Sequence, residues 1–158
     1  MISVTRRYRF PASHRLHASH LTDAQNRELY GKCNNPYGHG HDYILEVAAT
    51  GEIDPESGLI VPTGHLDRLV TEQALRLFAY RYINIDVPAF RVLAPTTENV
   101  LLYIADLLGE HWSDYVPNSN VRLSRVSLQE TDRNGFEVFP GVVSRKQGSM
   151  RERVLAGV

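Results

Sequence analysis

The stretch His39–Thr50, HGHDYILEVAAT, indicates the fold, because its side chains divide between two faces with a period of two. Such alternation is typical of a β-strand with one buried face. One face carries His39, His41, Tyr43, Leu45, Val47 and Ala49. Residues 4–14 alternate in the same way, with Val4, Tyr8, Phe10, Ala12 and His14 on one face and Thr5, Arg7 and Arg9 on the other. These stretches predict two half-buried strands, joined by a long polar loop over residues 17–38.

The remaining elements follow from periodicity and capping residues. Apolar residues recur at helical spacing over Leu66–Phe78. A second helix begins in APTTENVLLYIADLLGEHW, where Thr96 or Thr97 can serve as its cap. Residues 121–130 and 136–139 predict two further strands. The predicted fold is α+β in the order β-β-α-α-β-β, with two helices on one face of a four-stranded, mainly antiparallel sheet.

Composition limits the class of protein. The 158 residues predict a single domain over 1–158, with a polar, loosely held tail from about Val142. The net charge of -1 argues against a nucleic-acid partner, and no apolar run is long enough for a membrane span. Because the N-terminus lacks an apolar signal core and Cys33 is the single cysteine, we expect a cytoplasmic protein without an internal disulfide.

Three histidines form a candidate metal site. His39 and His41 project from one face of a strand, and His14 can join them if the two N-terminal strands pair. Three neutral imidazoles that leave a fourth position open are typical of catalytic zinc. Three imidazoles favour zinc over copper or iron, although geometry is needed to decide. The alternative is that a His-x-His pair arises by chance in a chain with seven histidines.

Two further side chains have both a structural and a functional interpretation. Cys33 precedes His39 by six residues in CNNPYGHGH, and it is either a small buried residue or a thiol turned towards the metal. A nearby dication would favour its thiolate. Glu130 ends a predicted strand, where it is either solvated or accepts paired N–H donors from a guanidine-like heterocycle edge.

Four motifs together resemble one enzyme family. FPASHRL (residues 10–16), KCNNPYGHGHDY (32–43), PTTENV (95–100) and QET (129–131) resemble the 6-pyruvoyl-tetrahydropterin synthase family. The resemblance runs from about Tyr8 to Gly141. It is closer to the animal-type synthase than to the related 6-carboxytetrahydropterin synthase of queuosine biosynthesis.

The resemblance implies a fold, an assembly and a reaction. The fold is the tunnelling fold, in which sheet edges join into trimeric barrels and two trimers form a homohexamer with active sites between subunits. The reaction eliminates triphosphate from 7,8-dihydroneopterin triphosphate and rearranges its side chain to a diketone, without an external redox cofactor.

The resemblance also assigns site residues. Zinc would bind His14, His39 and His41, and Cys33 would move protons on the substrate side chain. Glu130 would anchor the pterin, and Thr96 and Thr97 would line the pocket from a neighbouring subunit. Arg15 and Lys32 are candidate contacts for the triphosphate, although each can be an ordinary solvated side chain.

The chain departs from the family at one pair of residues. Alignment on DVPAF places Ala79 and Tyr80 where the family has an Asp-His pair that activates the cysteine. Alanine has no titratable proton, and a tyrosine phenol is a poor proton relay at neutral pH. His65, beside Asp67, is a candidate replacement or a plain surface residue. Three outcomes follow: a slow family reaction, altered chemistry on a related pterin, or pterin binding without turnover.

Overall fold

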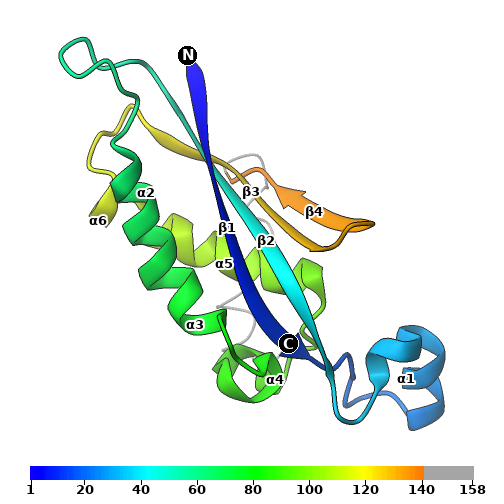
Figure 1. Ribbon diagram of the computed structural model, residues 1–158. Helices are drawn as coiled ribbons and strands as arrows, with labels where there is room; N and C mark the ends of the chain where they lie inside the picture. Colours follow the sequence, from blue (N-terminus) through cyan, green and yellow to red (C-terminus); the bar gives the residue numbers. More distant parts are fainter. Residues whose placement is uncertain (141–158) are drawn as a thin grey trace.

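The structure, a computed structural model, describes residues 1–140 as a four-stranded antiparallel sheet with helices on one face (Figure 1). The strands are β1 (Ile2–His14), β2 (His39–Gly51), β3 (Arg122–Thr131) and β4 (Asn134–Val138). They neighbour one another in chain order. The predicted α+β architecture is confirmed, while the tail expected from Val142 lies outside the described residues.

Two helical segments pack on the sheet, as predicted. The first is continuous through α2 (Thr63–Val70), a π-helical turn η2 (Thr71–Leu75) and α3 (Arg76–Phe78). The second is α5 (Thr97–Glu110), and the Thr96 hydroxyl accepts the Asn99 backbone N–H as its cap. The short elements are α4 (Ile83–Asp86), the 3-10 turn η3 (Pro88–Arg91) and α6 (Trp112–Tyr115). Within residues 1–140, none of the helices is long and apolar enough to cross a membrane.

The segment between β1 and β2 is more ordered than the sequence predicts. It contains α1 (Asp23–Tyr30) and the 3-10 turn η1 (Gly31–Asn34), which form a lobe beyond the ends of the two strands (Figure 1). Thr22 and Gln25 form a reciprocal capping box at the start of α1. The expectation of a loop over 17–38 was wrong because this helix is polar, and its cap is a weaker signal than an apolar stripe.

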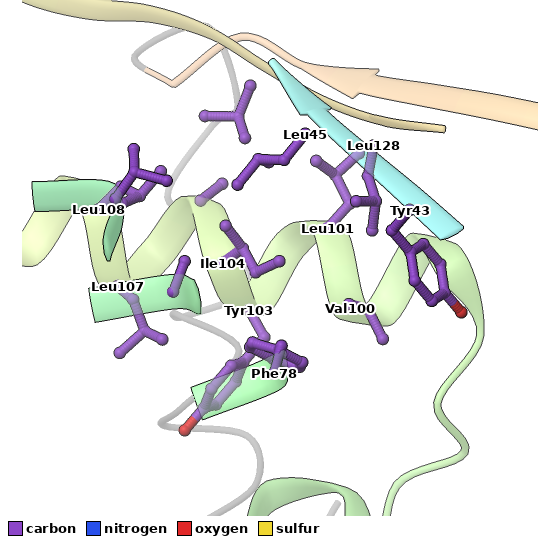
Figure 2. Packing of buried hydrophobic residues seen from close by; sticks show 14 of the residues in the cluster. Tyr43, Leu45, Phe78, Val100, Leu101, Tyr103, Ile104, Leu107, Leu108 and Leu128 are labelled. Carbon is purple, nitrogen blue, oxygen red and sulfur yellow. The ribbon is translucent and has the colours of Figure 1, made fainter. Parts of the chain in front are cut away.

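The core lies between the sheet and α5. Leu45 and Leu128 from β2 and β3 face Leu101 and Ile104 of α5 (Figure 2). Full burial of such a side chain stabilises the fold by about 1.5–3 kcal/mol. Tyr43, at one end of this core, is fully buried, and its hydroxyl lies 3.3 Å from Nδ1 of His14, the last residue of β1 (Figure 2).

The segment after α3 attaches to the outer edge of β1. The Tyr80 N–H donates to the Pro11 carbonyl at 2.7 Å, and the Ser13 N–H donates to the Arg81 carbonyl at 2.9 Å. Tyr80 has a φ of 61°, which is uncommon for a residue other than glycine. Its side chain is 87% exposed. The neighbouring β1 edge therefore holds Tyr80 in a strained backbone conformation with its ring directed outward.

Candidate active site

The three histidines meet where β1 ends and β2 begins. His14 is the cross-strand partner of His39 in the antiparallel register, and His41 follows on the same face. Ligand atoms of all three lie within 4.8 Å of one another. The Nε2 atoms of His14 and His39 are 3.3 Å apart. The predicted strand pairing is thus confirmed, and it brings the three imidazoles together.

The contacts of His14 fix which nitrogen faces the cluster. Its ring is fully buried, and Nδ1 lies 2.8 Å from the Pro95 carbonyl oxygen. Because a carbonyl only accepts, Nδ1 carries the proton and Nε2 presents its lone pair to the other histidines. Burial lowers the pKa of His14 to about 4 and also lowers the pKa of His39. Both rings are therefore neutral at physiological pH, as metal binding requires.

The residues present fit a zinc ion. Two nitrogens bound at 2.0–2.1 Å to a tetrahedral ion lie about 3.4 Å apart, close to the observed separation of His14 and His39. Within the described residues, His41 Nε2 and His39 Nδ1 are buried without a hydrogen-bond partner. Each buried polar atom left without a partner lowers the free energy of unfolding by about 1–3 kcal/mol. A ligand that accepts the His41 lone pair would remove that cost.

Glu130 borders the cluster with one carboxylate oxygen. Its Oε1 lies 3.5 Å from His14 Nε2 and 3.8 Å from His41 Nε2. The Thr97 hydroxyl donates to the same oxygen at 2.7 Å, and the Tyr43 hydroxyl donates at 3.5 Å. No residue within 1–140 donates to Oε2, so this oxygen is available to a ligand. Burial, together with Glu130, raises the pKa of Tyr43, which therefore stays a hydroxyl donor.

Cys33 reaches the same region from the η1 turn. The Leu16 N–H donates to the Cys33 carbonyl at 2.8 Å, which ties this turn to the chain just after His14. The thiol is half-buried. Burial and, to a lesser extent, the charge of Glu130 raise its pKa. In the protein alone the thiol form is favoured, so the expected thiolate would require a bound cation or a nearby base.

The two threonines at the start of α5 make different contacts within the chain. Thr96 caps α5 with its hydroxyl. Thr97 is buried and donates to Glu130 of its own chain. Within one chain the Thr97 hydroxyl orients Glu130. That both threonines line the pocket of a neighbouring subunit stays a prediction for the assembled protein.

The candidate triphosphate contacts differ in their surroundings. Lys32 is exposed on the η1 turn. Arg15 follows His14, and its Nε donates to the Asn34 carbonyl at 3.2 Å. The Asn84 side chain binds the Arg15 backbone twice: it accepts the N–H at 2.8 Å and donates to the carbonyl at 2.9 Å. Asn84 thereby fixes the chain direction immediately after the first histidine.

Replacement of Asn84 by alanine should weaken zinc binding about tenfold, because partners that hold metal ligands in place commonly contribute that much. The zinc dissociation constant can be measured by competition with a chromogenic chelator. Asn118→Ala is a matched control, since Asn118 accepts a backbone N–H in a turn outside the cluster. Equal zinc affinity in Asn84→Ala and the wild type would contradict a positioning role.

His65 lies far from the cluster within one chain. It is in the first turn of α2, at the opposite end of the sheet from α1 (Figure 1). Its neighbour Asp67 is bound at 2.9 Å by Arg6 Nε and Nη2 and by the Tyr8 hydroxyl. Arg6 precedes His14 by eight strand residues, or roughly 26 Å. A relay role for His65 therefore stays a prediction that needs a second chain.

Sequence reasoning missed the residues that orient the site. They act through hydrogen bonds to atoms distant in sequence, and they are Tyr43, Pro95, Asn34 and Asn84. Gly38, which directly precedes the histidine pair, could have indicated from the sequence that the chain passes close to another segment there. A Cβ there would lie 2.9 Å from the His14 carbonyl oxygen, so glycine is required for close strand approach.

Comparison with known proteins agrees with this fold. The family model for 6-pyruvoyl tetrahydropterin synthase matches residues 3–140. The human 6-pyruvoyl tetrahydrobiopterin synthase is 40% identical over 131 residues, which cover 83% of this chain and 86% of the human protein. The synthase from Poecilia reticulata is 38% identical over 131 residues, or 83% of this chain and 85% of that protein.

Solved structures give the same result. The 6-pyruvoyl tetrahydropterin synthase of Caenorhabditis elegans aligns with a TM-score of 0.78 at 35% identity, covering 87% of this chain and 94% of that one. The Plasmodium falciparum synthase aligns at 0.60 with 14% identity, covering 87% and 96%, and supports the fold alone. The architecture is thus an α+β tunnelling fold with a clustered triad of histidines at one end of its sheet. The chain belongs to the 6-pyruvoyl tetrahydropterin synthase family.

Proposed function

We propose that the protein is a zinc-dependent lyase that releases triphosphate from 7,8-dihydroneopterin triphosphate and rearranges the side chain to a diketone. The observation that carries this proposal is the convergence of three imidazoles with Glu130 at one end of the sheet. Cys33 supports it, because Glu130 is close enough to shift the pKa of its thiol.

Glu130 is proposed to bind the amino-pyrimidine edge of the pterin. Its oxygen Oε1 is oriented by the hydroxyls of Thr97 and Tyr43, and Oε2 is free to accept an N–H from the ring. Charge-assisted hydrogen bonds of this kind are about twice as strong as neutral ones. This arrangement selects a heterocycle with adjacent donors and sets its side chain beside the histidines.

The chemistry on the side chain is proton transfer. His14, His39 and His41 would hold a zinc ion, which would supply Lewis-acid polarisation of a side-chain oxygen when bound. Cys33 is proposed to exchange protons with the side-chain carbons. Loss of a proton from the carbon next to the phosphate-bearing carbon provides the electron pair that expels triphosphate, and the enol that forms tautomerises to a ketone with a terminal methyl group. The oxidation of both hydroxyl-bearing carbons to ketones is balanced by reduction of the dihydropterin ring and of the terminal carbon. No external oxidant is required.

The proposal is tested by incubating zinc-loaded protein with 7,8-dihydroneopterin triphosphate and measuring free triphosphate. We expect release that disappears in protein stripped of metal and returns when zinc is restored. If zinc-loaded protein releases no more than stripped protein, the lyase proposal fails.

A second candidate function is favoured by Tyr80. Tyr80 lines a cavity of about 840 Å³ together with Gly40 and His41, and no described residue within 1–140 forms a hydrogen bond with its hydroxyl. The Asp-His pair expected from the family is replaced by Ala79 and Tyr80. The alternative proposal is therefore a divergent homologue with altered pterin chemistry, or a pterin-binding protein with little turnover.

Restoring the pair by Ala79→Asp with Tyr80→His should raise the rate of triphosphate release by about 10²-fold, the usual contribution of a general acid or base. Histidine tolerates the left-handed backbone at position 80 better than most residues. The rate constant kcat from steady-state kinetics measures the effect, with Tyr80→Phe as the control for the phenol. An unchanged kcat in the double variant would mean that the missing pair does not limit turnover.

The assembly and location are also proposed. β1 and β4 are the edge strands of the sheet, and edges of this kind invite pairing between chains. We propose a homohexamer of two trimers with active sites between subunits, to which Tyr80 contributes through its outward-facing ring. Analytical ultracentrifugation tests the hexamer. A cytoplasmic location is proposed from the single cysteine.

A further inference from the structure

Asn34 connects three segments beside the candidate site. Its side chain is 93% buried, and Nδ2 donates to the Leu16 carbonyl at 2.7 Å. A carbonyl oxygen only accepts, so this bond fixes which end of the amide is nitrogen. The second hydrogen of Nδ2 then points to His17, whose Nδ1 lies 3.1 Å away.

This orientation determines the tautomer of His17. Because Asn34 Nδ2 can only donate, His17 Nδ1 must accept, and the ring is neutral with its proton on Nε2. The half-buried ring therefore presents a fixed N–H donor on the side opposite Asn34. No other side chain or backbone group within residues 1–140 forms a hydrogen bond with this nitrogen.

A cationic group lies on the other side of the same asparagine. Arg15 Nε donates to the Asn34 carbonyl at 3.2 Å, and its backbone is held by Asn84. The two Nη groups of Arg15 have no hydrogen-bond partner in the described part of the chain. Guanidinium groups suit phosphate oxygens, which accept several hydrogen bonds at once. Arg15 and His17 thus both contact Asn34, and each has N–H groups left to donate to a ligand.

We infer that His17 Nε2–H, with Arg15, binds the anionic polyphosphate tail of the substrate and makes the site selective for phosphorylated pterins. The inference rests on the proposed function and adds the residue that recognises the tail. The Leu16 N–H donates to the Cys33 carbonyl, which places this pair of donors next to the η1 turn that carries the Cys33 thiol. His17 acts as a neutral donor, so its role does not require protonation.

The test compares the affinity of two fluorescent probes, oxidised neopterin triphosphate and oxidised neopterin, for the full-length zinc-loaded protein. His17→Phe should weaken binding of the triphosphate probe about tenfold, as expected for a charge-assisted hydrogen bond, and leave neopterin binding unchanged. His17→Gln retains an N–H donor and should stay within about threefold of the wild type. His20→Phe is the matched control, because His20 is exposed three residues further along.

Two results would overturn the inference. One is equal affinity of His17→Phe and wild type for the triphosphate probe, and the other is a wild type that binds neopterin as tightly as its triphosphate. Imidazole ¹⁵N spectra provide an independent check, since we expect the proton of His17 on Nε2, and a proton on Nδ1 contradicts the argument. Failure of the lyase proposal has a different result. In that case the protein releases no triphosphate but still binds the two probes with different affinities.

Discussion

Cys33→Ala is expected to lower the rate of triphosphate release by about 10³-fold, within the range for loss of a general acid or base. The contact of residue 33 with Leu16 runs through its backbone carbonyl, so alanine preserves the η1 turn. The imidazoles and Glu130 are unaffected by the change. Zinc content and neopterin affinity should therefore equal those of the wild type, and kcat should fall alone.

The appropriate comparison is Cys33→Ser, which replaces the thiol by a hydroxyl of similar size that is a much weaker acid. We expect its kcat to be close to that of Cys33→Ala, because a hydroxyl exchanges protons poorly at neutral pH. Full activity in either variant would show that the thiol is a half-buried structural residue, the alternative interpretation of a single cysteine.

His41→Ala is expected to reduce zinc content from one ion per chain to below detection after dialysis. His41 Nε2 has no hydrogen-bond partner among residues 1–140, so its removal breaks no hydrogen bond at this atom and gives up only the 3.8 Å approach to Glu130 Oε1. The melting temperature of metal-free His41→Ala should thus equal or exceed that of the metal-free wild type. Zinc should raise the melting temperature of the wild type and leave the variant unchanged, because binding stabilises only a competent site.

His65→Ala is the matched histidine control for this experiment. His65 lies on α2, away from the cluster, and its removal should leave zinc content intact. A variant of His41 that still bound one zinc ion would contradict the assignment of the three ligands. A loss of kcat in His65→Ala with normal zinc content would support a relay role for His65 from a second chain.

The sequence predicted the parts of the molecule that repeat a pattern. Alternation located β1 and β2, and their shared inner face correctly grouped His14 with His39 and His41. The apolar stripe of α5 was found from helical periodicity in the same way, and of the two predicted capping residues, Thr96 or Thr97, the structure shows Thr96 in that role. Local periodicity determines which side chains are buried, so these features depend little on the rest of the chain.

The parts that escaped prediction depend on contacts between distant segments. Nothing near Tyr43 in sequence indicates that its hydroxyl lies between His14 and Glu130. The amide contacts of Asn34 and Asn84 span 18 and 69 residues, respectively. The left-handed backbone of Tyr80 arises from its bond to Pro11, which no local preference of tyrosine predicts.

Ala79 and Tyr80 stand where the resemblance to the family predicts an Asp-His pair. Ala79 follows α3 and is half-buried, whereas Tyr80 lies beside the edge of β1 with an exposed ring. The candidate metal ligands lie on β1 and β2 and the proposed pterin anchor Glu130 lies on β3, so neither includes this pair. We therefore expect the protein to bind pterin with near-normal affinity but to release triphosphate at a reduced rate.

Anomalous X-ray diffraction from crystals of the protein, recorded on both sides of the zinc absorption edge, tests most directly whether one cation sits among the imidazoles. We predict a single strong peak per chain, within about 2.1 Å of one nitrogen from each of His14, His39 and His41. Crystals grown with excess zinc that gave no peak there, or showed the rings turned apart, would contradict the account.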